Sequence, residues 1–82
     1  MKLIDTVKMM NSADYKERFR GEYFQLKIRI EGLGNMLEKY KNGTLTFTPS
    51  CSYELLHSQL VVMIKYLEIL EDRANIEDIN LD

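Results

Sequence analysis

Cationic and aromatic side chains are mixed over fifteen consecutive positions in the first half of the chain. Aromatic rings stack on nucleobases, while arginine and lysine form charge-assisted hydrogen bonds with phosphate groups. A mixture of this kind is therefore typical of a surface that binds a nucleotide. The residues concerned are Tyr15, Lys16, Arg18, Phe19, Arg20, Tyr23, Phe24, Lys27 and Arg29.

At helical spacing these side chains separate into two faces. One face carries Lys16, Arg20, Tyr23 and Lys27, and another carries Arg18 and Arg29. The short run of cations fits a small anionic nucleotide better than a long polymer. The aromatic residues have two possible roles, stacking on a base or packing in a core, and we expect the core role for Phe19 and Tyr23. Tyr15, at the start of the helix, is the aromatic residue expected to be free for stacking.

Residues suited to catalysis or metal binding are sparse. Cys51 and His57 are six positions apart, so on a continuous helix they point in different directions and form no nucleophile–base pair. His57 and Glu54 have the spacing of two metal ligands on a helix, but two ligands without a third make a weak zinc site. We therefore expect no enzymatic activity, no metal centre and no cofactor.

The composition predicts one folded domain that spans residues 1–82. The chain is 45% hydrophobic and 29% charged, with four glycines and one proline, which argues against disorder and low complexity. No apolar run approaches the roughly 18 residues of a membrane span, and the first residues lack the apolar stretch of a secretory signal. The single cysteine is compatible with a reducing cytosol. A net charge of −2 argues against bulk binding to duplex DNA.

The spacing of the apolar residues predicts two long helices. In each of two segments the apolar positions alternate in steps of three and four, which is a heptad seam and not the period-two alternation of a strand. The first segment runs through Phe19, Tyr23, Leu26, Ile30, Leu33, Leu37 and Tyr40. The second runs through Tyr53, Leu56, Leu60, Met63, Leu67, Leu70 and Ala74. The fold class expected is all-α.

Capping residues mark the ends of both helices. Asp14 is placed as an N-cap with Glu17 at the capping-box spacing, and Asn42-Gly43 supplies a left-handed C-terminal stop. Thr48-Pro49 fits an N-cap followed by proline at the first helical position. The expected helices lie near 14–41 and 49–74.

The remaining segments are short. The connection at 44–47 makes the two helices antiparallel neighbours, and its alternation indicates a brief extended segment. Ahead of the hairpin, a short amphipathic helix of about two turns is expected to end at Asn11-Ser12. The glycines within the first helix, Gly21, Gly32 and Gly34, indicate either a close approach of another element or a local kink.

A second apolar stripe lies beside the seam of the second helix. Its members, Leu55, Val62, Ile69 and Ile76, recur every seven residues. A two-helix hairpin covers only one stripe of each helix, so this surface needs a further partner. The N-terminal helix and the tail after Ala74 are one candidate partner. Other copies of the chain are the other candidate, and we favour assembly into a homo-oligomer.

Both expected helices contain short motifs that can be compared with those of known families. In the first they are Tyr15-Lys16-Glu17-Arg18-Phe19, Glu22-Tyr23-Phe24-Gln25-Leu26, Arg29-Ile30-Glu31 and Met36-Leu37-Glu38-Lys39-Tyr40-Lys41. In the second they are Tyr53-Glu54-Leu55-Leu56-His57-Ser58-Gln59-Leu60, Met63, Tyr66-Leu67-Glu68-Ile69-Leu70 and Arg73-Ala74. Over residues 15–74, most of the chain, this pattern resembles the small phage proteins of the anti-CBASS sponge family.

The resemblance implies a compact helical protein that assembles as a hexamer in the cytoplasm of the infected bacterial host. Such proteins bind cyclic oligonucleotide second messengers, such as cyclic GMP-AMP, without cleaving them, and so block effector activation. By the same resemblance Tyr15 corresponds to a stacking tyrosine and Lys27 to a phosphate-pairing lysine, with Arg29 as its competitor. Arg73 is the candidate for a separate site that takes cyclic trinucleotides. Arg18, Arg20 and Tyr23 complete the expected ligand-binding set.

Two alternative functions stay open at this point. Related phage sponges capture cyclic ADP-ribose-type signals instead of cyclic oligonucleotides. A different class of function follows from the second apolar stripe, which in a helical-hairpin adaptor would bind a host or phage protein and leave nucleotides unbound.

Overall fold

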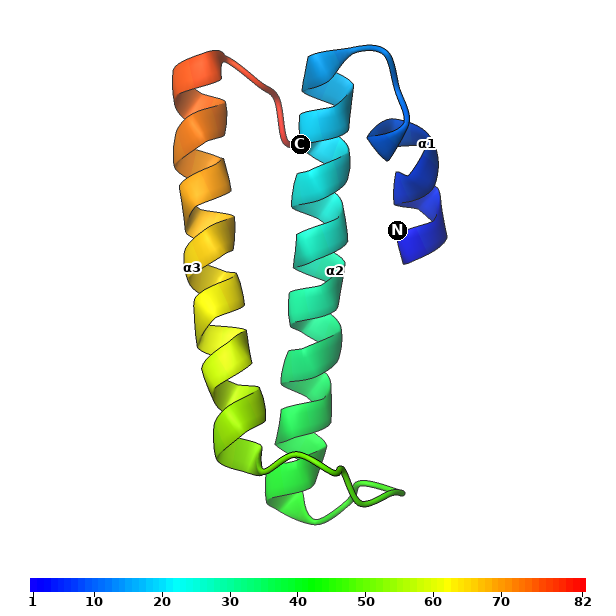
Figure 1. Ribbon diagram of the computed structural model, residues 1–82, viewed down its shortest axis with the longest axis vertical. Helices are drawn as coiled ribbons and strands as arrows, with labels where there is room; N and C mark the ends of the chain where they lie inside the picture. Colours follow the sequence, from blue (N-terminus) through cyan, green and yellow to red (C-terminus); the bar gives the residue numbers. More distant parts are fainter.

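The computed structural model describes residues 1–82 and is entirely helical. A 3₁₀ turn, η1 (Leu3–Thr6), leads directly into a one-turn helix, α1 (Val7–Met10). Two long helices follow, α2 (Tyr15–Asn42) and α3 (Tyr53–Glu77). The predicted all-α class is confirmed, as is a short N-terminal helix ahead of an antiparallel hairpin (Figure 1).

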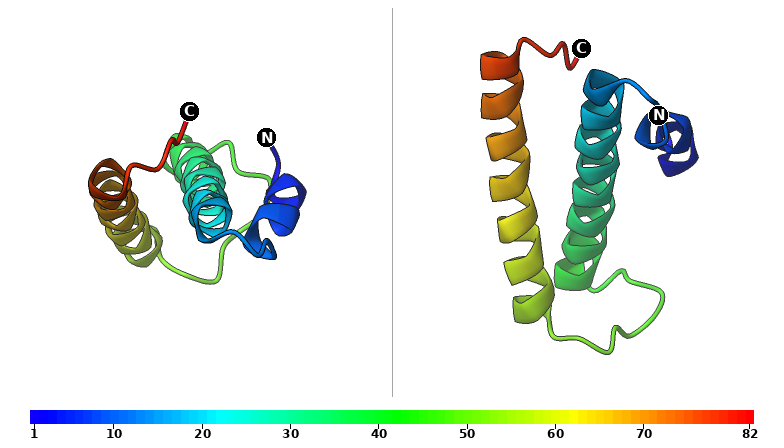
Figure 2. Two further views of the ribbon diagram at one scale, coloured as in Figure 1. Left: turned by 90° about the horizontal axis from the view of Figure 1, so that it is seen from above. Right: turned by 45° about the horizontal axis from the view of Figure 1, so that its top comes forward.

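The helices lie in a row with α2 in the middle. α3 packs along one side of α2, while η1 and α1 pack against the other side and make no comparable contact with α3 (Figures 1 and 2). The molecule is elongated, with principal extents of 43 × 24 × 19 Å. None of its helices combines the length and the apolarity that crossing a bilayer requires.

The ends of α2 are those that its capping residues predict. The carboxylate of Asp14 accepts a hydrogen bond from the backbone N–H of Lys16 (3.1 Å). The backbone N–H of Asp14 donates to the hydroxyl of Ser12 (3.1 Å), so Glu17 does not complete the expected capping box. At the other end, Gly43 adopts the left-handed conformation (φ 74°), which a residue with a side chain adopts less readily.

The predicted start of the second helix is wrong by four residues. Ser52, and not Thr48, is the N-cap of α3, and its hydroxyl accepts a hydrogen bond from the backbone N–H of Leu55 (3.1 Å). The Thr48-Pro49 pair therefore belongs to the connection, which contains no extended strand. The helix also continues beyond Ala74 to Glu77, where Asp78 terminates it with a positive φ of 57°.

The core of the hairpin lies at the end distant from the connecting loop. There the first half of α2 meets the last turns of α3, and the tail after α3 covers the junction. The buried cluster consists of Phe19, Tyr23, Leu26, Leu70, Ala74 and Ile79. The core role expected for Phe19 and Tyr23 is confirmed, since these residues are 2% and 6% exposed.

The second apolar stripe of α3 is left uncovered within the chain. The tail docks in the core through Ile79, and the N-terminal segment packs on α2, so neither reaches the outer face of α3. As a result Leu55 is 60% exposed, Val62 is 68% exposed and Ile76 is 84% exposed. Intramolecular coverage of this stripe, one of the two expectations from the sequence, is therefore wrong.

Gly21 is the point of closest approach between the N-terminal segment and α2. A Cβ atom placed there would lie 2.9 Å from Met10 Cγ, 3.0 Å from Met10 N and 3.0 Å from Met9 Cβ. Gly32 and Gly34 have no such neighbour within 4 Å, and α2 continues through both positions. Close approach therefore explains the first glycine and nothing within the chain explains the other two.

Replacing Gly21 by alanine is expected to lower the free energy of unfolding by roughly 1–3 kcal/mol, because the new methyl group meets backbone that cannot yield without displacing α1. The matched control is Gly32→Ala, which adds the same methyl group in open space and is expected to raise stability by up to about 1 kcal/mol. Urea unfolding followed by circular dichroism measures both. Equal effects of the two substitutions would contradict the packing described.

Candidate functional site

Tyr15 and Arg73 meet where α2 begins and α3 ends. Arg73 Nη2 donates a hydrogen bond to the Tyr15 hydroxyl (3.1 Å), which donates in turn to Glu77 Oε1 (2.6 Å). Arg73 Nε closes the network on Glu77 Oε2 (3.3 Å). The Arg73 guanidinium also lies 5.0 Å from the ring centroid of the buried Phe19. The result is a fixed guanidinium beside a tyrosine residue that remains 46% exposed.

The protonation states in this cluster are held by its hydrogen bonds. The hydrogen bond to the Glu77 carboxylate raises the pKa of the Tyr15 hydroxyl, because it favours the neutral phenol. The hydrogen bond from Tyr15 lowers the pKa of Glu77, and the bond to Tyr15 raises the pKa of Arg73. At neutral pH the cluster therefore presents a neutral ring, a cation and one carboxylate.

Tyr23 and Lys27 line a second feature about two to three turns further along α2. The Tyr23 hydroxyl donates to Glu71 Oε2 (2.9 Å), and Lys27 Nζ lies 6.0 Å from the Tyr23 ring centroid. Burial, followed by the bond to Glu71, raises the pKa of Tyr23. These residues line a cleft of about 430 Å³ whose other walls are the last turns of α3 and the tail to Asp82.

A third tyrosine repeats the same kind of contact. The Tyr66 hydroxyl of α3 donates to the Glu22 carboxylate of α2, which raises the pKa of Tyr66. Each long helix thus gives tyrosine hydroxyls to carboxylates of the other on the flanks of the apolar seam. Hydrogen bonds to a charged partner are stronger than neutral ones, so these contacts help fix the register of the hairpin.

Arg20 and Lys16 are directed toward the tail. Arg20 Nη1 donates to the backbone carbonyl of Asn80 (2.7 Å), and Lys16 Nζ donates to that of Asp78 (3.1 Å). Arg20 Nε is buried without a hydrogen-bond partner, and its nearest carboxylate, on Glu17, lies 3.9 Å away. Both cations therefore lie on the face of α2 that carries Tyr23, as the helical spacing predicts.

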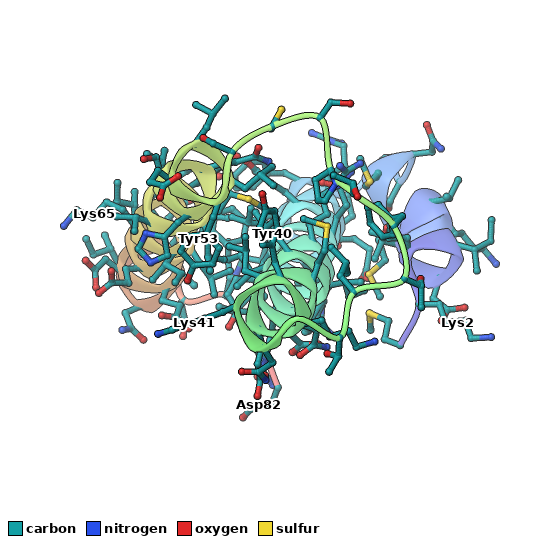
Figure 3. The ribbon with its side chains drawn as sticks, turned by 90° about the horizontal axis from the view of Figure 1, so that it is seen from below. Lys2, Tyr40, Lys41, Tyr53, Lys65 and Asp82 are labelled. Carbon is teal, nitrogen blue, oxygen red and sulfur yellow. The ribbon has the colours of Figure 1, made fainter.

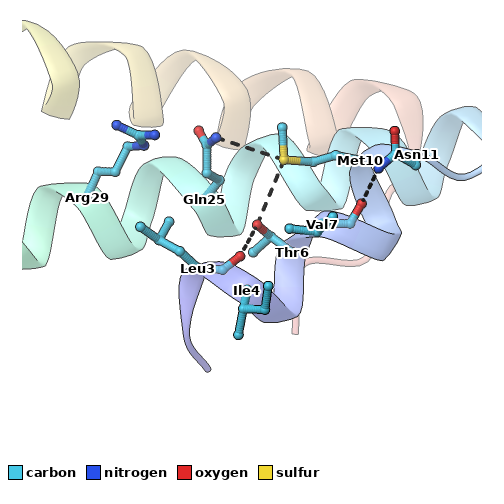
Figure 4. A pocket seen from close by; sticks show the side chains of 8 residues that line it. All are labelled: Leu3, Ile4, Thr6, Val7, Met10, Asn11, Gln25 and Arg29. Atoms are coloured by element: carbon cyan, nitrogen blue, oxygen red, sulfur yellow. Dashed lines mark hydrogen bonds between the residues drawn. The ribbon is translucent and has the colours of Figure 1, made fainter.

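Arg18 and Arg29 lie apart from these residues. Arg18 Nη1 donates to the carbonyls of Ser12 (2.9 Å) and Ala13 (3.0 Å), which secures the turn before α2. Arg29 lies at one edge of a pocket of about 520 Å³ between α2 and the N-terminal segment (Figure 4). Opposite it are the apolar side chains of Leu3 and Val7.

The candidate residues therefore form groups and not one continuous site within a single chain. The structure brings Tyr15 to Arg73 and places Arg20, Tyr23 and Lys27 beside the tail. The sequence did not identify Glu71, Glu77 or the tail as neighbours of these groups. The spacing of Arg73 and Glu77, one helical turn apart, was the only local signal for any of them.

The residues considered for catalysis lie at the opposite end of the molecule. Tyr40 and Tyr53 meet edge to face there (Figure 3), with ring centroids 5.7 Å apart. The His57 ring stacks on Tyr53, with centroids 5.8 Å apart. Cys51 is exposed in the loop. No group of three or more His, Cys, Asp or Glu side chains is placed to hold a metal ion.

The fold and these clusters define a class of small helical-hairpin protein with exposed aromatic and cationic side chains and an uncovered apolar face. The chain belongs to the Sequestin family, whose model matches residues 13–76. This assignment confirms the phage-family resemblance drawn from the sequence. The chain is also 39% identical to the "Uncharacterized 7.5 kDa protein in denB-rIIB intergenic region" of Enterobacteria phage T4. That match extends over 59 residues, 72% of this chain and 88% of the T4 protein. No solved structure matches the chain.

The tyrosine–carboxylate contacts predict how stability depends on pH. Because the folded-state pKa of Tyr15 is raised, its stabilising contribution is complete below the unfolded pKa and is lost as the pH rises through the folded pKa. The lowered pKa of Glu77 gives the reverse: its contribution is present above the unfolded pKa and is lost as the pH falls through the folded pKa.

Glu77→Gln is expected to return the pKa of Tyr15 toward the ordinary value of 10.0, because the carboxylate that raises it is removed. Tyrosinate absorbance during an alkaline titration measures the change, and Tyr15→Phe identifies which tyrosine titrates. The control Glu71→Gln removes the partner of Tyr23 and should move a different phenol. An unchanged titration of Tyr15 in Glu77→Gln would contradict the described hydrogen bond.

Proposed function

We propose that this phage protein sequesters cyclic oligonucleotide second messengers, cyclic dinucleotides or trinucleotides such as cyclic GMP-AMP, in the cytoplasm of the infected bacterium. It holds them without cleavage and so blocks the activation of defence effectors. The observation that carries this proposal is the match to the Sequestin family over residues 13–76. That segment includes all seven candidate residues: Tyr15, Arg18, Arg20, Tyr23, Lys27, Arg29 and Arg73.

The chemistry of the Tyr15 cluster supports a nucleotide ligand. Tyr15 is 46% exposed, which leaves its ring accessible for stacking on a base, and base–aromatic stacking contributes about 1–3 kcal/mol. The Arg73 side chain is also 46% exposed while its hydrogen bonds hold its position, so part of the guanidinium fork is open to a phosphate oxygen. Little side-chain freedom is lost on binding, because Glu77 already orders both groups.

Assembly of several copies supplies the rest of the site in this proposal. The exposed stripe of α3 gives each chain an apolar surface that water does not favour, and a second copy can cover it. The candidate residues are separated within one chain, so a crevice between chains is the arrangement that brings groups from different places onto one ligand. We propose a homo-oligomer, a hexamer, with binding sites between subunits.

Sequestration requires only equilibrium affinity, because no transition state has to be stabilised. Isothermal titration calorimetry with cyclic GMP-AMP, cyclic di-GMP, a cyclic trinucleotide and cyclic ADP-ribose isomers tests the proposal directly. Chromatography of the recovered ligand distinguishes storage from cleavage. If only the cyclic ADP-ribose isomers bind, the messenger is of that type and not a cyclic oligonucleotide. If no ligand gives a heat of binding, an adaptor that binds a protein is favoured.

Lys27→Ala is expected to weaken the binding of the preferred cyclic nucleotide by about 1–3 kcal/mol, the range of a hydrogen bond to a charged group. Lys27 is exposed at the edge of the Tyr23 cleft, so its loss should leave the helices intact. Lys65→Ala, which removes the same charge from an exposed position of α3, is the matched control. Equal affinities of the two variants for the nucleotide would show that Lys27 is not part of the binding site.

Val62→Glu is expected to dissociate the oligomer, because it places a charge in the apolar stripe that adjoining copies cover. Helix content should persist, since Val62 is 68% exposed within its own chain. Light scattering measures the mass of the particle and circular dichroism its helix content. Asn35→Glu, at an exposed position of α2, adds the same charge away from the stripe. A Val62→Glu particle with the mass of the wild type would exclude this stripe as the interface.

A further inference from the structure

The five residues after α3 form a tail that folds back over α2. Asp78 takes a left-handed conformation (φ 57°), and the backbone N–H of Ile79 donates to the Ala74 carbonyl (2.9 Å). This turn sends residues 79–82 across the hairpin toward the first turns of α2 (Figure 1), a course also visible from above (Figure 2). Ile79, 7% exposed, and Leu81 pack on the buried cluster and hold the tail in place.

The tail accepts hydrogen bonds from two cationic side chains of α2. Lys16 Nζ donates to the carbonyl of Asp78 (3.1 Å), and Arg20 Nη1 donates to the carbonyl of Asn80 (2.7 Å). Lys16 and Arg20 are four residues apart on a helix, so they project from one face about one turn apart. Two backbone oxygens of the tail thus lie where the oxygens of a ligand could be bound.

Backbone carbonyls are weak partners for this pair. Hydrogen bonds from Lys16 and Arg20 to carbonyls are already charge-assisted because the donors are ionised. A carbonyl oxygen carries only a partial charge, however, whereas a phosphate oxygen carries a formal negative charge and adds a coulombic attraction to each cation. Arg20 is also incompletely paired, because its Nε is buried without a hydrogen bond. An anion that reached Lys16 and Arg20 would therefore be a better partner than the tail.

Two features set the tail apart from the rest of the hairpin. It lies outside the segment that the family model matches, residues 13–76. In addition, the tail depends on Asp78, the only residue other than glycine with a positive φ, a conformation that L-residues adopt reluctantly.

We infer that Lys16 and Arg20 form an anion-binding pair that the tail, residues 78–82, covers until a phosphate-bearing ligand displaces it. This inference rests on the proposed function for the identity of the natural ligand, a cyclic oligonucleotide. Lys16 thereby joins the binding residues, and the tail carbonyls act as an internal competitor. If a ligand binds only the uncovered pair, its apparent affinity is its affinity for that pair multiplied by the fraction of molecules in which the tail is released.

A pair of substitutions at Asp78 tests the inference. Asp78→Val opposes the left-handed conformation and should release the tail, while Asp78→Gly loses the same charge but accepts that conformation and should keep the tail docked. The probes are inorganic pyrophosphate and cyclic di-GMP, titrated by calorimetry. Asp78→Val is expected to bind pyrophosphate roughly 5-fold to 30-fold more tightly than Asp78→Gly, the range set by the strain of a left-handed residue.

Hydrogen exchange of the Ile79 amide reports directly on the tail. It should be slow in the free wild-type protein and in Asp78→Gly, and it should accelerate in Asp78→Val and upon addition of pyrophosphate to the wild type. A truncation after Glu77 removes both tail carbonyls and repeats the affinity test without a substitution at residue 78, and circular dichroism verifies its helices. Adding Lys16→Gln to the truncated chain should abolish the gain in affinity.

The outcomes separate this inference from the proposed function. Equal pyrophosphate affinities of the truncated and full-length chains, or an Ile79 amide that stays protected when pyrophosphate binds, would overturn the inference even if cyclic di-GMP binds well. If no cyclic nucleotide binds but release of the tail still strengthens pyrophosphate binding in a Lys16-dependent way, the covered anion pair stands and the proposed ligand class fails.

Discussion

Each helix of a two-helix hairpin can bury only one stripe against its partner, and the rest of the structure depends on this limit. α2 gains a second neighbour because the N-terminal segment packs against its other side. α3 has no second neighbour, so the stripe from Leu55 to Ile76 stays at the surface. The same geometry that completes a small core at one end of the hairpin thus leaves an apolar face along its whole length.

The polar contacts between the long helices are adapted to this narrow core. Tyr15, Tyr23 and Tyr66 each place an aromatic ring at the edge of the seam and donate a hydroxyl to a carboxylate of the opposite helix. Apolar packing alone tolerates a shift of one heptad, whereas directional hydrogen bonds do not. These contacts also keep the phenols neutral and ordered, which is the state in which a ring can stack on a base.

The proposed binding groups and the core share one end of the molecule. Phe19 is buried in the core and also lies under the Arg73 guanidinium, while Tyr23 is buried and also lines the Lys27 cleft. The tail contributes Ile79 to the core and carbonyl oxygens to Lys16 and Arg20. Stability and the accessibility of these cations are therefore coupled here, because the residues that hold the tail also determine which cations are covered.

The sequence by itself determined the class of the fold, the two long helices and the core roles of Phe19 and Tyr23, because helical periodicity is a local property that apolar spacing records directly. It also identified the α2 caps at Asp14 and Gly43. It failed at the start of α3, which the Thr48-Pro49 pair placed four residues too early, whereas the helix in the structure is capped by Ser52. The neighbours of the candidate residues were decided by the tertiary structure alone. Glu71 reaches Tyr23, and the tail reaches Arg20, only because the hairpin closes. Contacts between residues about fifty to sixty positions apart produce no periodic pattern in the sequence, so the spacing of residue types does not predict them.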